Sequence, residues 1–178
     1  YYYKAISTLR LARSLDDSIG LASAIANAGD EFVKIKNYDS ALLFFNESKI
    51  IFDKANYLSG KGYCLGNIGR VYTNLGKNDL GERYLNDGIR ILEEAEDYYP
   101  ICDYLLSLAD IYSSRKNMQA ALNYAQRSLT LAEQYKLKEQ VANAEQKVSE
   151  LYENMGIMSE SLKHYKNYIT YRDSLNTL

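Results

Sequence analysis

Apolar residues recur along the chain at steps of three and four positions, not at steps of two. One such run consists of Leu65, Ile68, Tyr72 and Leu75. This spacing places apolar side chains on one face of an α-helix and predicts amphipathic helices rather than strands. Polar breaks separate the runs: Lys36-Asn37, Gly76-Lys77-Asn78, Lys116-Asn117 and Gly156. Because Gly and Asn tolerate a left-handed backbone, these breaks predict turns between paired helices.

The pair pattern repeats every 40 residues without a gap. The aligned segments are residues 27–45 (NAGDEFVKIKNYDSALLFF), 67–85 (NIGRVYTNLGKNDLGERYL), 107–125 (SLADIYSSRKNMQAALNYA) and 147–165 (KVSELYENMGIMSESLKHY). One aromatic column consists of Phe32, Tyr72, Tyr112 and Tyr152. Two columns of small residues are Gly29, Gly69, Ala109 and Ser149, and Ala41, Gly81, Ala121 and Ser161. Bulky and small residues at fixed positions are what closely packed helix pairs need.

These columns resemble the tetratricopeptide repeat, whose pattern W-x2-L-G-x2-Y…A-x3-F forms a helix-turn-helix. The likeness is carried by residues 65–72 (LGNIGRVY) and 81–85 (GERYL), in which Leu65 replaces the Trp, Gly69 and Tyr72 match, and Gly81 and Leu85 replace the Ala and the Phe. No unit has the Trp or the closing Pro, and Glu145 takes a normally apolar place in the last unit. The resemblance covers essentially the whole chain.

The period of 40 exceeds the ~34 residues of an ordinary tetratricopeptide and falls near the ~40 to 47 of HEAT and armadillo units. The order and spacing of the Gly-x2-Tyr and Ala-x3-Phe positions favour the tetratricopeptide over these alternatives. The additional residues lie between units, as in residues 53–61 (DKANYLSGK) and 93–100 (EEAEDYYP). They are expected to lengthen both helices of each unit by part of a turn.

The resemblance implies an all-α fold: a right-handed α-α superhelix of about four helix-turn-helix repeats and one N-terminal half-repeat, in a single domain. The expected boundaries are 1–17 for the second helix of a truncated repeat, then 20–57, 60–97, 99–137 and 139–176 for the four repeats. Residues 1–12 (YYYKAISTLRLA) align with second helices, which indicates a piece of a longer protein. We expect the face carrying Tyr2, Ala5, Ile6 and Leu9 to be frayed or covered by a second molecule.

The composition limits the classes of partner that the chain is expected to bind. The 21 basic and 23 acidic residues leave a net charge of −2, which offers no basic patch for nucleic acid. The 18 tyrosines fall mostly in the packing columns and are interpreted as core rather than as stacking platforms for bases. The longest apolar runs, such as residues 41–45, are far shorter than the ~20 residues of a bilayer span, so no direct membrane insertion of this segment is expected.

Candidate chemistry is sparse. Cys64 and Cys102 show no CxxC spacing and are interpreted as small buried hydrophobic residues. The only histidine, His164, is expected to be a surface imidazole. The glycine-rich residues 60–66 (GKGYCLG) follow no predicted strand, so they are not expected to bind phosphate. The sequence therefore predicts no enzyme, no metal site and no cofactor.

Binding is the remaining class, and the resemblance implies that it uses the concave groove lined by the first helix of each repeat. The residues predicted to bind a peptide or protein there are Asp30, Lys34, Tyr63, Arg70, Asn74, Asp103, Asp110 and Glu150. Acidic residues exceed basic ones along this wall, which favours a polar or basic segment as the ligand. A carboxylate clamp of the chaperone-adaptor type is disfavoured, since the best alignment (Arg70, Asn74, Ser107, Asn143 and Lys147) lacks one basic residue and the middle Asn.

Residues 161–178 (SLKHYKNYITYRDSLNTL) resemble the last repeat of the tetratricopeptide arrays in Bacteroidetes-type sensor histidine kinases and regulators. This resemblance implies the sensing or interaction domain of a bacterial membrane-associated signal-transduction protein, on the periplasmic side of the inner membrane. A cytoplasmic peptide- or protein-binding regulator is the alternative. A homodimer through the terminal repeats is a further assembly to consider.

Overall fold

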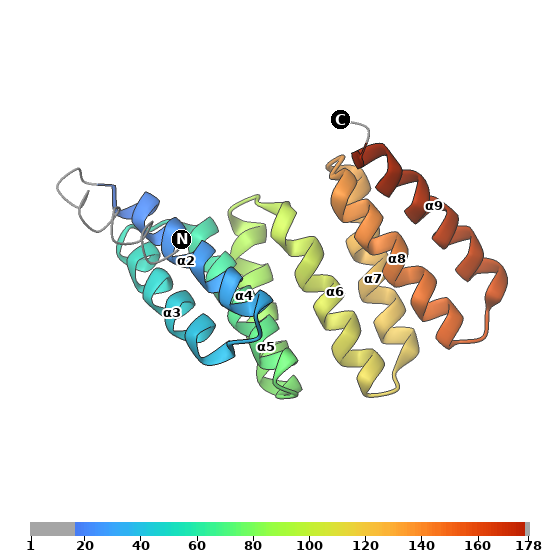
Figure 1. Cartoon of the computed structure of the whole chain (residues 1–178), viewed down its shortest axis with the longest axis horizontal. Helices are drawn as coiled ribbons and strands as arrows, with labels where there is room; N and C mark the ends of the chain where they lie inside the picture. Colours follow the sequence, from blue (N-terminus) through green and yellow to red (C-terminus); the bar gives the residue numbers. More distant parts are fainter. Residues whose placement is uncertain (1–16, 177–178) are drawn as a thin grey trace. The chain divides into compact units, whose positions relative to one another are not determined.

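The computed structural model describes residues 17–176, and it is helical throughout apart from short links (Figure 1). Two compact units divide the chain, with the boundary between Asp97 and Tyr98. In unit 1 the helices are α2 (Ser18–Lys34), α3 (Tyr38–Lys54), α4 (Leu58–Asn74) and α5 (Asn78–Glu94). In unit 2 they are α6 (Tyr98–Ser114), α7 (Met118–Gln134), α8 (Lys138–Asn154) and α9 (Met158–Asn176). The predicted all-α fold of consecutive helix pairs is confirmed.

The prediction for the N-terminal half-repeat falls almost entirely on residues 1–16 and lies outside the described residues. No described helix is both long enough and apolar enough to cross a membrane.

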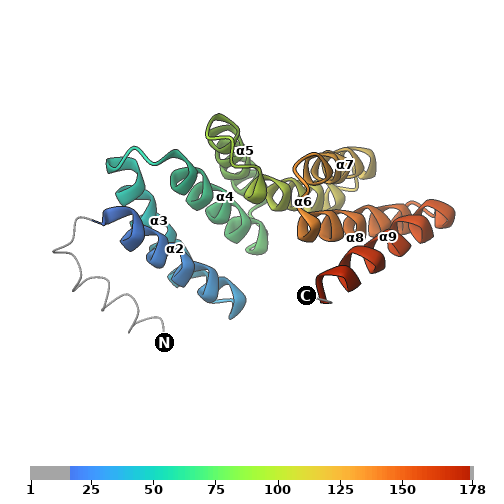
Figure 2. The ribbon, with the colours of Figure 1, turned by 90° about the horizontal axis from the view of Figure 1, so that it is seen from above.

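A regular length explains the 40-residue period. Each of the helices α2 to α8 has 17 residues, and each begins 20 residues after the one before it. Three-residue links, such as residues 35–37 and 75–77, join successive helices. Figure 2 shows α2 beside α3 and α4 beside α5 in unit 1, and α6 beside α7 and α8 beside α9 in unit 2. Two such helices and their links make up one 40-residue repeat.

The same hydrogen-bonded turn closes every described helix from α2 to α8. At the end of α2, for example, the Asn37 N–H donates to the Phe32 carbonyl at 2.9 Å and the Lys36 N–H to that of Val33 at 2.9 Å. This pair of bonds is the Schellman motif, which requires a left-handed residue after the helix. The left-handed residues are Lys36, Asn56, Gly76, Glu96, Lys116, Lys136 and Gly156. The predicted breaks are thus confirmed, and equivalent turns also separate the repeats.

We predict that Lys116→Gly raises the free energy of unfolding. Lys116 is exposed and has a φ of 60°, a conformation that is disfavoured for a residue with a Cβ atom. Glycine removes that penalty but loses more backbone entropy, so the net gain should be about 0.5 to 1 kcal/mol. Urea denaturation measures it. Lys116→Ala keeps the Cβ and is the control, and an equal gain there would contradict the explanation.

The aromatic column packs against a second aromatic column of the following helix. The ring pairs are Phe32–Phe44 (5.1 Å between centroids), Tyr72–Tyr84 (5.5 Å), Tyr112–Tyr124 (5.2 Å) and Tyr152–His164 (5.5 Å). Each pair joins the two helices of one repeat, at a separation typical of favourable aromatic contacts. His164 therefore takes the aromatic position of the last repeat.

The expectation of a surface imidazole at His164 is wrong. Its side chain is only 14% exposed, and its Nδ1 lies 2.5 Å from Oε2 of Glu145, which is itself 4% exposed. Asn167 Nδ2 donates to the other carboxylate oxygen of Glu145 at 2.9 Å. Glu145 occupies the place that Leu65 and Leu105 take in earlier repeats, and two polar groups from α9 compensate its burial.

Small residues let the helices of unit 1 approach closely. A Cβ atom built on Gly69 would lie 2.9 Å from the carbonyl oxygen of Gly81, and one on Gly88 would lie 2.7 Å from the backbone nitrogen of Gly66. These backbones leave no room for a side chain. The small-residue columns predict the contact of Gly69 with Gly81, whereas Gly66 and Gly88 lie outside those columns. Cys64 and Cys102 are fully buried, and burial raises the pKa of each thiol to about 12. The interpretation of both cysteines as buried hydrophobic residues is confirmed.

Candidate functional site

Within each of the two units, the first helices of its two repeats pack against one another. In unit 1 α2 contacts α4, and in unit 2 α6 contacts α8, whereas no comparable contact joins the second helices of either unit over the residues described. The first helices therefore converge on one side of each unit. We call their face on that side the inner wall, and it is the surface on which the predicted binding residues were placed.

The inner wall of unit 1 carries a hydrogen-bonded group that joins α2 to α4. The Tyr63 hydroxyl donates to Asp30 Oδ2 at 2.5 Å, although the two residues are 33 positions apart. One turn further along α4, Arg70 Nη1 donates to Asn67 Oδ1 at 3.2 Å. Asn67 is 2% exposed, and its Nδ2 has no hydrogen-bond partner in the part of the chain that is described. The structure thus brings together three predicted residues and adds Asn67, which sequence reasoning missed.

Burial governs the electrostatics of this group. Removal from water raises the pKa of Asp30, while the Tyr63 hydrogen bond and the charges of Arg70 and Lys34 act in the opposite direction. Burial and the neighbouring Asp30 together raise the pKa of the Tyr63 phenol. Tyr63 therefore stays protonated at neutral pH and acts as a hydrogen-bond donor.

The two remaining predicted residues of unit 1 lie outside this group. Lys34 is exposed at the end of α2 and pairs with Glu31 on its own helix. Asn74 is exposed at the last position of α4.

The inner wall of unit 2 carries an ion-pair group that joins α6 to α8. Lys147 Nζ lies 2.9 Å from Asp110 Oδ1 and 2.9 Å from Glu150 Oε2. Burial disfavours the charged Lys147, but its hydrogen bonds to the two carboxylates outweigh that effect and raise its pKa. Asp103, the third acidic residue predicted here, is half-buried two turns earlier on α6.

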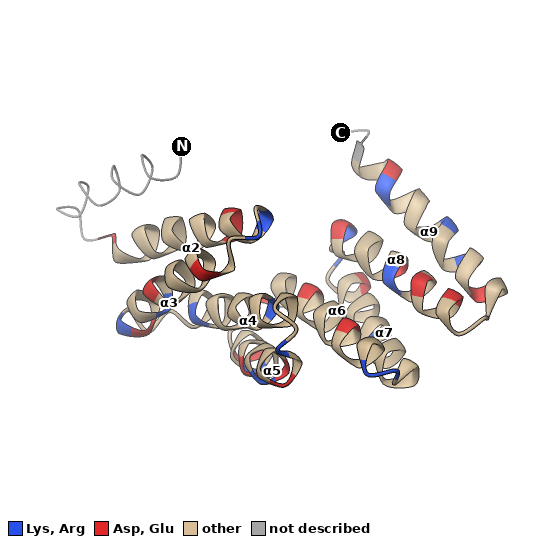
Figure 3. Ribbon diagram, turned by 60° about the horizontal axis from the view of Figure 1, so that its bottom comes forward, with Lys and Arg blue, Asp and Glu red and all other residues tan. Residues whose placement is uncertain are grey.

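This group leaves a net negative charge on the inner wall of unit 2. Lys147 faces two carboxylates, and these keep much of their surface in water, with side-chain exposures of 54% for Asp110 and 45% for Glu150. Figure 3 shows both signs of charge along α8. On the inner wall Lys147 lies between the carboxylates of Asp110 and Glu150, so this group is mixed rather than uniformly acidic. Because Lys147 is already paired with two carboxylates, the structure adds a reason against using it to clamp a ligand carboxylate.

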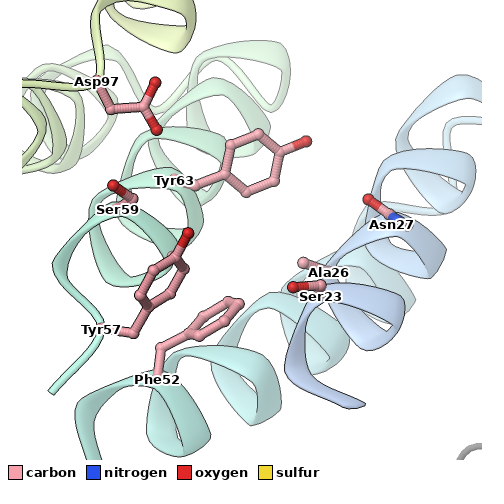
Figure 4. Close-up of a pocket in the computed structure, with 9 residues that line it drawn as sticks. Ser23, Ala26, Asn27, Phe52, Tyr57, Ser59, Tyr63 and Asp97 are labelled. Atoms are coloured by element: carbon pink, nitrogen blue, oxygen red, sulfur yellow. The ribbon is translucent and has the colours of Figure 1, made fainter. Parts of the chain in front are cut away.

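A pocket of about 170 Å³ opens between α2 and the start of α4 in unit 1. Its lining residues are Ser23, Ala26, Asn27, Phe52, Tyr57, Ser59, Gly60, Tyr63 and Asp97. Figure 4 shows the Phe52 and Tyr57 rings at one end of this pocket and the Asp97 carboxylate at the other. Among the predicted site residues, only Tyr63 lines it. The sequence signal that could have found it is the clustering of Phe52 and Tyr57 around the turn that leads into α4.

No group of three or more His, Cys, Asp or Glu side chains in residues 17–176 is arranged to hold a metal ion.

The sequence model of the tetratricopeptide repeat family matches residues 63–134. The fold is that of the tetratricopeptide repeat. The matched residues run from α4 to the end of α7 and contain the second and third predicted tetratricopeptide repeats almost entirely. No curated protein matches the chain in sequence.

Solved structures share this tetratricopeptide fold at low sequence identity. BtubC (BKLC) from P. vanneervenii is 14% identical with a TM-score of 0.73, over 99% of this chain and 72% of that one. The Rap conjugation gene regulator of the plasmid pLS20, in complex with the Phr* peptide, is 16% identical with a TM-score of 0.86, over 98% and 48%. A Rap protein complexed with Competence and Sporulation Factor is 15% identical with a TM-score of 0.81, over 96% and 49%. The chain thus spans about half the length of the two Rap structures.

Proposed function

We propose that the chain is a non-enzymatic scaffold that binds a peptide or a protein segment on its inner walls. The observation that carries this proposal is the pairing of polar side chains across neighbouring first helices: Tyr63 with Asp30 in unit 1 and Lys147 with Asp110 in unit 2. Such pairs hold polar groups in fixed positions on a partly exposed face, which is what recognition of an extended backbone requires. Two solved structures of this fold contain the Phr* peptide and Competence and Sporulation Factor, which supports the proposal.

The ligand that fits these walls best is a polar or basic segment. In unit 2 the half-exposed carboxylates of Asp110 and Glu150 outnumber the single ammonium group of Lys147. A complementary positive charge on the ligand would speed its association and select against acidic segments.

We propose, as the wider role, the sensing or interaction domain of a bacterial membrane-associated signal-transduction protein, either a histidine kinase or a transcriptional regulator, on the periplasmic side. The support is the resemblance of residues 161–178 to sensor arrays. A cytoplasmic peptide-binding regulator is the second candidate, supported by the likeness in fold to the two Rap structures. The gene that encodes the chain distinguishes them: an apolar span of ~20 residues followed by a kinase or DNA-binding module favours the first.

A peptide library tests the binding function. The purified chain should select peptides rich in Lys or Arg. Asp110→Asn should weaken the binding of these peptides at least fivefold in fluorescence anisotropy, because it removes one of the two carboxylates beside Lys147 and so makes the inner wall less negative. Asp87→Asn is the matched control, since Asp87 is exposed on the second helix α5 and away from the inner wall. Failure to select any peptide, or equal weakening by both variants, would contradict the proposal.

A further inference from the structure

The pocket of unit 1 has the chemistry of a cation site. Its apolar walls are the rings of Phe52 and Tyr57, whose centroids lie 5.4 Å apart, together with the ring of Tyr63. The face of an aromatic ring is electron-rich and attracts ammonium and guanidinium groups within ~6 Å. Phe52 is only 2% exposed, so Tyr57 and Tyr63 supply most of the aromatic surface that a cation could contact.

The hydrogen bond of Tyr63 strengthens this property. Its hydroxyl donates to the Asp30 carboxylate at 2.5 Å, which pushes electron density from the phenol oxygen into the ring. The bond also fixes the orientation of the ring, because Asp30 sits on α2 and Tyr63 on α4. A pre-oriented ring loses less entropy when a ligand binds.

Charge around the pocket favours a positive ligand. Among residues 17–176, Asp97 is the only lining residue that carries a charge, and no Lys, Arg or His of this range contributes to the lining. Lys49 and Lys61 both pair with Asp53, at 3.5 Å and 2.6 Å. Lys54, which lies between Phe52 and Tyr57 along the chain, is exposed at the end of α3 and does not line the pocket. A cation that enters the pocket would thus meet the Asp97 carboxylate.

One feature acts in the opposite direction. Tyr57 precedes α4 without providing a side-chain cap, so the first amides of that helix retain a partial positive charge. Ser59 and Gly60, from this first turn, also line the pocket. An anion is therefore the competing ligand, but it would be repelled by the full charge of Asp97.

We propose that this pocket binds the side chain of a Lys or Arg residue of the bound segment, with the rings of Tyr57 and Tyr63 beside the cationic group and Asp97 opposite it. The proposal rests on the proposed function, and it assigns a specific subsite to the basic preference. The volume of about 170 Å³ suits the end of one such side chain rather than a whole peptide.

Small probes test the subsite without any peptide. N-acetyl-arginine amide is expected to bind the full chain with a Kd in the millimolar range, measured by NMR titration. Its neutral isostere, N-acetyl-citrulline amide, should bind at least fivefold more weakly, and N-acetyl-glutamate amide should not bind measurably. Equal binding of the arginine and citrulline probes, or tighter binding of the glutamate probe, would overturn the proposal.

Variants locate the binding. Asp97→Asn and Tyr57→Leu should each weaken the arginine probe about three- to fivefold, since the first removes the charge while keeping the shape and the second removes the aromatic ring while keeping an apolar side chain. Asp87→Asn on α5 is the control and should leave it unchanged. Circular dichroism of every variant excludes loss of folding as the cause, and a folded Tyr57→Leu protein with unchanged affinity would contradict the assignment.

The two proposals can fail separately. If the arginine probe binds as expected but the library selects no peptide, the subsite stands and the scaffold function falls. If selected peptides bind equally well to the chain and to Asp97→Asn and Tyr57→Leu, the scaffold function stands and the subsite falls.

Discussion

Gly88→Ala is expected to lower the free energy of unfolding of the chain by about 2 kcal/mol. A Cβ atom at this position of α5 would lie 2.7 Å from the backbone nitrogen of Gly66 and 2.9 Å from the carbonyl oxygen of Gly62, both on α4. Backbone atoms cannot rotate away as a side chain can, so the clash belongs at the upper end of the ~1 to 3 kcal/mol cost of overpacking. Alanine regains about 1 kcal/mol of helix propensity, which leaves the net loss.

Urea denaturation followed by circular dichroism measures this effect, and Ser128→Ala is the matched control. Ser128 holds the same column in unit 2 and already carries a Cβ atom, so its replacement removes only the hydrogen bond from Oγ to the Cys102 carbonyl at 2.9 Å. That loss should cost about 1 kcal/mol. If Gly88→Ala were as stable as the unmodified chain, the close approach of α4 and α5 would not be a constraint on the sequence.

His164→Phe is expected to lower the free energy of unfolding by about 3 kcal/mol. The substitution keeps an aromatic ring against Tyr152 but removes the donor at 2.5 Å from the Glu145 carboxylate. Glu145 is 3% exposed, so it would keep its burial and lose one of its two partners. Leaving a buried acceptor without its partner costs about 1 to 3 kcal/mol, and more for a charged group, so the buried Glu145 carboxylate places the expectation at about 3 kcal/mol.

The double variant E145L/H164F should recover most of that stability. It restores the combination of a leucine and an aromatic residue that Leu65 with Tyr84 and Leu105 with Tyr124 provide in the earlier repeats. Replacement of both partners of a buried hydrogen bond by apolar groups of similar shape can be nearly neutral or stabilising. A double-mutant cycle by urea denaturation gives the coupling. Equal destabilisation by His164→Phe with and without Glu145→Leu would show that the Glu145 contact is unimportant.

The positions of the helices and of the turns within the repeats could be predicted from the sequence, because helices and turns depend on local interactions. The 3.6-residue period needs only neighbouring residues on one helix, and the Schellman turn at Lys36 spans residues 32–37. The aromatic column at Phe32, Tyr72, Tyr112 and Tyr152 could be recognised in the sequence, because each of these residues packs at the equivalent position between the two helices of its repeat. The exact 20-residue spacing of the helices follows from the same local rules, although the sequence showed only the 40-residue period.

Part of the candidate site could also be predicted. The positions of Asp30, Tyr63 and Arg70 on the inner wall followed from the family pattern, and the structure brings Asp30 and Tyr63 into contact. The interaction partner of each charged side chain could not be predicted. Lys34 pairs with Glu31 on its own helix, whereas Lys147 is held by Asp110 and Glu150.

The sequence by itself therefore determined the all-α class, the helix pairs and the turns within the repeats at Lys36, Gly76, Lys116 and Gly156. Tertiary structure alone decided that His164 is buried on Glu145, that the buried Asn67 accepts a hydrogen bond from Arg70, and that Phe52, Tyr57 and Asp97 share one pocket. The physical reason is the distance along the chain over which the interactions act. Periodicity and turns are set by residues within about five positions of one another, whereas burial, ion pairing and pocket shape depend on how closely two helices pack, which side chains from distant positions decide together.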